Sequence, residues 1–261
     1  MSGLALKAVI LSALTVAGLV YGGLCAVLFV AQRSMLYFPT PETRLPGAAA
    51  IALPSGGETL RIWARPVEGP QALVYFGGNA EDVAGNFTPF AGAMPGRAIY
   101  LVNYRGYGGS SGSPSEQALF DDALAVYDWA RQKHQSIAVV GASLGSGVAA
   151  YLAANRPVER LILVTPFDSI ENVARARFPV LPISLLLKDR FDSAARVPAI
   201  AAKTLIVVAE HDEVIPRERT DALIASFPAG QARVEVLEGT GHNTVADSPR
   251  YLELIAGFLQ N

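Results

Sequence analysis

Residues 139–148 read VVGASLGSGV and place one serine, Ser143, between Gly141 and Gly145. This G-x-S-x-G spacing is typical of a strand-to-helix turn that holds a nucleophilic serine above a β-sheet. Glycine tolerates such a turn because it has no Cβ to clash with nearby backbone. Ordinary glycine-rich turns can match the same motif, so the neighbouring sequence must distinguish a nucleophile turn from an ordinary turn. The apolar run SIAVVGA precedes the serine and predicts a strand, and the small residues of 143–154 predict a helix.

Strands and helices alternate on both sides of this turn. Apolar runs predict strands at 48–53, 60–66, 71–76, 98–104, 136–142, 160–165, 204–210 and 232–238, and helices are expected near 77–93, 114–133, 143–154, 217–227 and 248–259. Such an alternation predicts an α/β fold, with a mostly parallel twisted sheet and helices on both faces. Functional groups of these sheets collect beyond the carboxyl ends of the strands. The helix after residue 112 is expected to begin with a capping box from Ser113 to Glu116, with Pro114 as its first residue.

Composition excludes several classes of protein. Half of the 261 residues are apolar, the net charge is −2, and no basic stripe exists, so we expect no nucleic-acid partner. The one cysteine, Cys25, excludes an internal disulfide and a cysteine-built metal site. The glycines at 141, 145 and 147 do not fit a dinucleotide-binding motif, and no phosphate-binding G-K-[ST] is present. We therefore expect neither a metal nor a cofactor.

The first residues differ from the rest. Residues 8–31 contain no charge, and a helix of that length crosses a hydrocarbon layer roughly 30 Å thick. A cleaved signal peptide is the alternative, but its apolar region is shorter and ends in a small-x-small site, which neither Ala26 nor Ala31 fits. We predict a membrane anchor at 1–34 and a single α/β domain at 35–261. Gly18 and Gly22 form a G-x-x-x-G pair that permits a weak homodimer, although glycine is frequent in membrane helices.

A serine hydroxyl needs a base, and the chain contains three histidines. His134 ends a predicted surface helix, where a solvated or capping role is expected. His211 adjoins acidic residues. His242 lies in EGTGHNTV, a loop between the last strand and the last helix, where the base of this fold belongs.

The base must in turn be oriented by a carboxylate. Asp212 follows the preceding strand, and Glu210 and Glu213 are rivals that spacing alone does not separate. The chain order of serine, acid and histidine matches α/β-hydrolases. For the oxyanion hole we expect the backbone N–H groups of Leu144, directly after the serine, and Asn79, in the turn FGGNAED.

Beyond residue 34 the chain resembles the α/β-hydrolases, and more narrowly the membrane-anchored serine hydrolases of the alpha/beta-hydrolase domain-containing group, some of which remove palmitate from proteins. The resemblance rests on YFGGNAED, NYRGYGGSSGSPSE, GASLGSG, TPFDSI, LPISLLLKDRFDS, HDEVIP and GTGHNTV. It implies Ser143 as nucleophile, Asp212 as the acid and His242 as the base. Many relatives carry histidine where this chain has Gly77, and this departure bears on the oxyanion donor.

The expected activity is hydrolysis of carboxylic esters or thioesters through an acyl-enzyme. Residues 166–198 are too short for a large lid, so we expect a small cap, with room for two short helices, or no cap. A site of this kind beside a bilayer suits acyl-chain or lipidated substrates, and we expect a single-pass protein of a bacterial inner membrane. A peptidase or amidase, and a non-catalytic membrane-tethered binding module, are the alternatives.

Overall fold

The computed structural model describes residues 3–260, in which an eight-stranded sheet follows a long N-terminal helix. The strands are β1 (Ala49–Ser55), β2 (Glu58–Arg65), β3 (Gln71–Phe76), β4 (Ala98–Val102), β5 (Ser136–Ala142), β6 (Arg160–Val164), β7 (Lys203–His211) and β8 (Ala232–Gly241). Their order is β1-β2-β4-β3-β5-β6-β7-β8. Strand β2 is antiparallel to both of its neighbours, and the pairings from β4 to β8 are parallel. The predicted mostly parallel sheet is confirmed.

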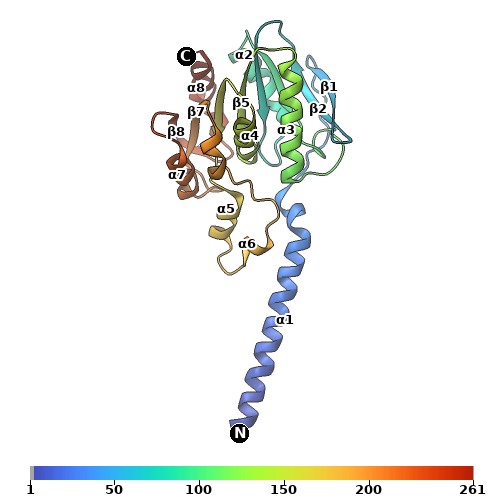
Figure 1. The fold of residues 1–261 in the computed structure, drawn as a ribbon, viewed down its shortest axis with the longest axis vertical. Coiled ribbons are helices and arrows are strands. Elements are labelled where there is room, and N and C mark those ends of the chain that lie inside the picture. Colours follow the sequence, from blue (N-terminus) through green and yellow to red (C-terminus); the bar gives the residue numbers. More distant parts are fainter. Residues whose placement is uncertain (1–2, 261) are drawn as a thin grey trace.

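Helices cover both faces of this sheet (Figure 1). Helices α3 (Glu116–Arg131), α4 (Leu144–Asn155) and α7 (Arg217–Ser226) pack on one face, and α2 (Phe87–Ala93) and α8 (Pro249–Gln260) pack on the other. Because side chains alternate along a strand, β3 supplies Val74 and Phe76 to the first core and Leu73 and Tyr75 to the second. Short 3₁₀ turns, η1 (Val83–Asn86) and η3 (Val245–Asp247), complete the second face.

Helix α3 begins later than the sequence predicts. Its N-cap is Ser115, whose hydroxyl accepts a hydrogen bond from the Ala118 N–H, so Pro114 lies outside the helix. The expected capping box does not form because the Glu116 carboxylate is engaged elsewhere. It accepts hydrogen bonds from the backbone N–H groups of Arg190 and Phe191, at 2.7 and 3.0 Å. The Glu116 carboxylate therefore binds the backbone of the cap segment that leads back to the sheet.

Of the two expectations, a small cap or none, the structure shows a small cap, which lies between β6 and β7 and contains two short helices. These are α5 (Ile170–Arg177) and α6 (Ile183–Leu186), followed by the 3₁₀ segment η2 (Ala194–Ala199). Both α5 and α6 lie on the side of the sheet from which α1 extends (Figure 1).

Helix α1 (Gly3–Leu36) projects away from the sheet as a single rod (Figure 1). Its segment Val9–Leu36 has a mean hydropathy of 2.2 and is long and apolar enough to cross a membrane. An apolar helix near the N-terminus is also typical of a signal sequence. Gly18 and Gly22 face open space in this single chain, so the homodimer stays a prediction.

Candidate active site

The turn between β5 and α4 holds Ser143 in a conformation that non-glycine residues rarely adopt. Its φ is 49° and its ψ is −115°, and its N–H donates to the Val164 carbonyl at 2.9 Å. The flanking glycines allow this turn to lie against the end of β3. A Cβ at Gly145 would lie 2.1 Å from the Phe76 carbonyl oxygen, and one at Gly141 would lie 2.2 Å from the oxygen of Gly145. Strain of this kind clusters at functional sites.

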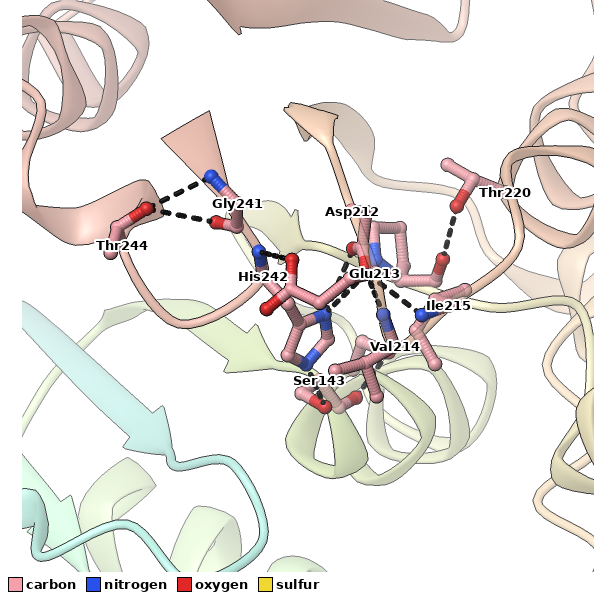
Figure 2. Close-up of polar contacts among 11 residues, drawn as sticks. Ser143, Asp212, Glu213, Val214, Ile215, Thr220, Gly241, His242 and Thr244 are labelled. Carbon is pink, nitrogen blue, oxygen red and sulfur yellow. Dashed lines mark hydrogen bonds and ion pairs between the residues drawn. The ribbon is translucent and has the colours of Figure 1, made fainter. Parts of the chain in front are cut away.

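His242 lies in the loop after β8 and reaches the serine directly (Figure 2). Its Nε2 is 2.9 Å from the Ser143 hydroxyl, and its Nδ1 is 2.8 and 2.9 Å from the two carboxylate oxygens of Asp212. The histidine is only 8% exposed. Since the carboxylate can only accept, Nδ1 carries the proton, and Nε2 is free to accept the hydroxyl proton.

The loop after β7 separates the three candidate carboxylates. Asp212 is held by the backbone N–H groups of Val214 and Ile215, which donate to its Oδ1 at 3.0 and 2.7 Å. Glu213 instead accepts a hydrogen bond from the His242 backbone N–H at 3.0 Å, and this bond lowers the pKa of its carboxyl. Glu210 accepts from the Gly239 N–H on the neighbouring strand. Only Asp212, of the three, meets the imidazole ring.

The other two histidines lie away from this cluster. His211 is largely exposed, with Nε2 3.4 Å from Glu210. His134 is buried, contrary to the surface position that was expected for it. Its ring turns inward, where Nε2 lies 2.7 Å from the Tyr100 hydroxyl and Nδ1 lies 3.0 Å from the Gly69 carbonyl. The hydrogen bonds to these two partners replace the hydrogen bonds to water that the His134 ring would form at the surface.

Of the two residues expected to supply the oxyanion donors, Leu144 follows Ser143 directly and Asn79 lies in the turn after β3. Leu144 is the first residue of α4, so its N–H has no partner within the helix. Asn79 follows β3 in a turn that packs closely on the serine, because a Cβ at Gly78 would lie 3.5 Å from that of Ser143. A Cβ at Gly77 would lie 2.7 Å from Val83, so a larger residue there would displace that side chain.

The side chain of Asn79 forms three hydrogen bonds that the sequence analysis did not predict. Its Nδ2 donates to the Leu36 carbonyl at 2.6 Å, and its Oδ1 accepts from the Phe38 N–H at 3.0 Å and the Tyr107 hydroxyl at 2.8 Å. Burial raises the pKa of Tyr107 to about 12, which keeps its phenol a donor. The turn beside Ser143 is thereby fastened to the end of α1.

A cavity of about 400 Å³ opens over Ser143 and His242. Tyr75, Glu81, Val164 and Tyr251 also line it. Glu81 is another residue that sequence reasoning missed. Its carboxylate accepts hydrogen bonds from the Gly78 N–H and the Tyr75 hydroxyl, so it fixes the turn that carries Asn79. A larger cavity, about 730 Å³, is lined by α5, α6 and the loop between them, and does not include the serine.

Known proteins share this architecture. The model of the alpha/beta hydrolase fold matches residues 71–185. The protein Rv2307c of Mycobacterium tuberculosis is 33% identical over 95% of this chain and 94% of its own length. The lysophosphatidylserine lipase ABHD12 of Danio rerio is 28% identical over 63% of this chain and about half (51%) of its own length.

Solved structures agree on the fold. The esterase Pf2001 of Pyrococcus furiosus superposes with a TM-score of 0.71 at 14% identity, covering 86% of this chain and 98% of its own. The mouse alpha/beta hydrolase domain-containing protein 10 gives a TM-score of 0.63 at 15% identity, covering 82% and 97%. The match to the alpha/beta hydrolase model and the order of the sheet identify the chain as a member of the α/β-hydrolase family, and the solved structures share its fold.

Proposed function

We propose that this protein is a serine hydrolase that cleaves carboxylic esters or thioesters with Ser143, His242 and Asp212. The observation that carries the proposal is the continuous path of hydrogen bonds from the Ser143 hydroxyl through the His242 ring to the Asp212 carboxylate, each 2.8–2.9 Å long. This path ends on a strained serine that lines a cavity. Such an arrangement suits nucleophilic catalysis.

The reaction follows from the roles of these atoms. The Ser143 Oγ attacks the acyl carbonyl while His242 Nε2 takes its proton, and Asp212 stabilises the resulting imidazolium. The imidazolium then protonates the departing alcohol or thiol, which leaves an acyl group on Ser143. A water molecule, deprotonated by the same Nε2, attacks this acyl-enzyme. Collapse of the second intermediate returns the proton to Ser143 and releases the acid.

The negative charge on the carbonyl oxygen needs donors during both steps. We assign this role to the backbone N–H groups of Leu144 and Asn79. The assignment is supported by the position of Leu144 at the start of α4 and by the close packing of the Gly78 turn on Ser143. The Asn79 side chain, already bonded to Leu36 and Tyr107, is not needed for it.

We further propose residues 1–34 as a membrane anchor for the domain at 35–261, with substrates that carry an acyl chain. The apolar helix and the names of similar proteins, an esterase, a thioesterase domain and a lysophosphatidylserine lipase, support this substrate class. In this proposal the membrane concentrates lipidated substrates beside the cavity.

Labelling by a fluorophosphonate probe tests the chemistry, on membranes that contain the wild type, Ser143→Ala, His242→Ala and His211→Ala. We expect the first two variants to lose labelling and to lower the turnover of nitrophenyl esters by roughly 10³-fold or more. His211→Ala is the matched control, because its ring is exposed and outside the cluster, and should label like the wild type. A wild type that neither labels nor hydrolyses any ester contradicts the proposal.

A further inference from the structure

The end of the cap is fastened to the end of α1 by a buried acidic side chain. Asp189 is only 5% exposed in its side chain, and its two oxygens accept hydrogen bonds from the Arg33 guanidinium at 2.9 and 3.1 Å. The Tyr37 hydroxyl donates to the same carboxylate at 3.1 Å. Asp189 therefore fixes the cap to α1 at Arg33, just beyond the uncharged segment of the helix.

Further contacts follow α1 toward its N-terminus in a regular order. The Lys188 N–H donates to Gln32 at 2.7 Å, and the Lys188 ammonium lies 4.0 Å from the ring centre of Phe29. Farther along, the Tyr21 hydroxyl donates to the Val180 carbonyl at 2.7 Å. Cap residues with lower numbers thus contact α1 residues with lower numbers. The cap runs alongside the helix rather than folding back over the sheet.

This ladder reaches far into the apolar part of α1. Tyr21 precedes Arg33 by 12 positions, which is about 18 Å along a helix axis. A hydrocarbon layer is roughly 30 Å thick, so its midplane lies about 15 Å from either surface. Val180 contacts the end of the Tyr21 side chain and not its backbone, so its depth differs from that of Tyr21 by at most the length of that side chain. Val180 therefore still lies well inside the hydrocarbon layer if α1 leaves that layer at Arg33.

The part of the cap that lies farthest along α1 from the sheet is apolar, as a position inside the hydrocarbon layer requires. Residues 178–186, which we name the cap tip, read FPVLPISLL and contain no charge. Val180 is 79% exposed and Leu185 is 83% exposed, and Phe178 is exposed as well. Large apolar side chains grouped at one exposed site mark a contact with a protein or a membrane. The adjoining helix α1, whose side chains are exposed from Val9 to Leu24, favours the membrane.

Cations border the cap tip on the side of the domain. Arg175 and Arg177 lie exposed in the last turn of α5, directly before the tip, and Lys188 follows it. Within residues 3–260, no carboxylate forms an ion pair with any of these three side chains. Unpaired cations above an apolar tip complement the phosphates of a lipid surface.

We propose that the cap tip inserts among the acyl chains of the leaflet that α1 enters, with Arg175, Arg177 and Lys188 at the level of the lipid phosphates. The inference rests on the membrane anchor within the proposed function, and not on the chemistry of Ser143. The cap joins β6 to β7, and Val164 at the carboxyl end of β6 lines the active-site cavity. A tip held in the leaflet therefore sets the cavity at a fixed height above it, where an acyl chain can pass from lipid to serine.

Site-directed fluorescence on the full-length protein tests this insertion. With Cys25→Ser as background, one cysteine is introduced by Val180→Cys or Leu185→Cys, labelled with an environment-sensitive dye, and reconstituted in vesicles of phosphatidylcholine and phosphatidylglycerol. Leu19→Cys, in the middle of α1, is the lipid-exposed control. Ala229→Cys, exposed in the turn before β8, is the water-exposed control. Quenching by nitroxide-labelled lipids is compared with quenching by aqueous iodide.

We expect the dyes at 180 and 185 to behave like the dye at 19, with several-fold stronger quenching by nitroxide lipids and several-fold weaker quenching by iodide than at 229. Quenching at 180 and 185 like that at 229, with position 19 in lipid, would overturn the insertion and leave the anchor intact. An iodide-accessible position 19 would overturn the anchor and the insertion together. Fluorophosphonate labelling of the same samples reports separately whether the hydrolase chemistry is present.

Discussion

Gly145→Ala tests the contact that forms the serine turn. The added Cβ would lie 2.1 Å from the Phe76 carbonyl oxygen and 2.6 Å from that of Gly77, where ordinary contacts begin at 3.4 Å. Both oxygens belong to the backbone at the end of β3, which cannot rotate aside as a side chain can. The turn must therefore move away from β3 by about 1.3 Å, the difference between 3.4 and 2.1 Å.

Such a displacement affects both stability and activity. Overpacking of this size costs about 1–3 kcal/mol, and each kcal/mol lowers Tm by about 2–4 °C in a domain of this length. The hydrogen bond of 2.9 Å between Ser143 and His242 does not survive a shift of this size. Misplacement of a reacting group by about 1 Å costs roughly 100-fold in rate. We expect a fall in Tm of about 2–12 °C and a loss of about 100-fold or more in kcat.

Thermal unfolding and the hydrolysis of a nitrophenyl ester measure the two effects. Gly92→Ala is the matched control, because a Cβ there meets nothing within 4 Å inside helix α2. It should raise stability by about 0.5–1 kcal/mol and leave activity unchanged. A Gly145→Ala variant with the Tm and activity of the wild type would refute the close approach of the turn to β3.

Three further predictions concern the groups around Ser143. Asp212→Asn should lower kcat by about 10⁴-fold because the amide no longer selects the required tautomer of His242. Glu213→Gln keeps an acceptor for the His242 backbone N–H, so kcat should fall by less than about tenfold. If Glu213→Gln and Asp212→Asn lowered ester turnover equally, the assignment of the His242 ring to Asp212 alone would be wrong. The pKa of Glu213 is lowered in the folded state, so its stabilisation exists above its ordinary pKa and disappears as pH falls through the lowered value. The difference in Tm between the wild type and Glu213→Gln should accordingly shrink as pH falls below the ordinary glutamate pKa of about 4.3 and through the lowered value. Asn79→Ala removes the bonds to Leu36 and Tyr107 but keeps its own N–H, so stability should fall by about 1–3 kcal/mol while probe labelling persists; loss of labelling without loss of Tm would place the donor in the side chain.

Local patterns predicted most of the backbone. The strand before Ser143 and the helix after it lie within one residue of their expected ends, at Ala142 and Asn155. Apolar runs and glycine turns act on neighbouring residues, so a short window of sequence contains the information. Helix α3 departs from its expected start because Glu116 bonds to Arg190 and Phe191, more than 70 positions away. A window around the helix does not contain those partners.

The same limit applies to the site. Spacing in the sequence placed Glu210, Asp212 and Glu213 in one loop without separating them, and only the family resemblance selected Asp212. The direction of each side chain depends on how β7 and β8 pair. His134 was expected at the surface, whereas its partners come from β4 and from the loop before β3. No local signal relates Asn79 to the end of α1, because that contact exists only when helix and turn are packed together.

The sequence by itself determined the alternation of strands and helices, the glycine-flanked serine, the order of serine, acid and histidine, and the long apolar helix. These are properties of backbone conformation and hydrophobicity, which depend on residues a few positions apart. Only the tertiary structure decided that Asp212 meets the His242 ring, that Asn79 fastens the turn beside Ser143 to α1, and that the cap descends along that helix. Those outcomes depend on contacts between residues 30 to 160 positions apart, and packing of the whole chain sets their geometry.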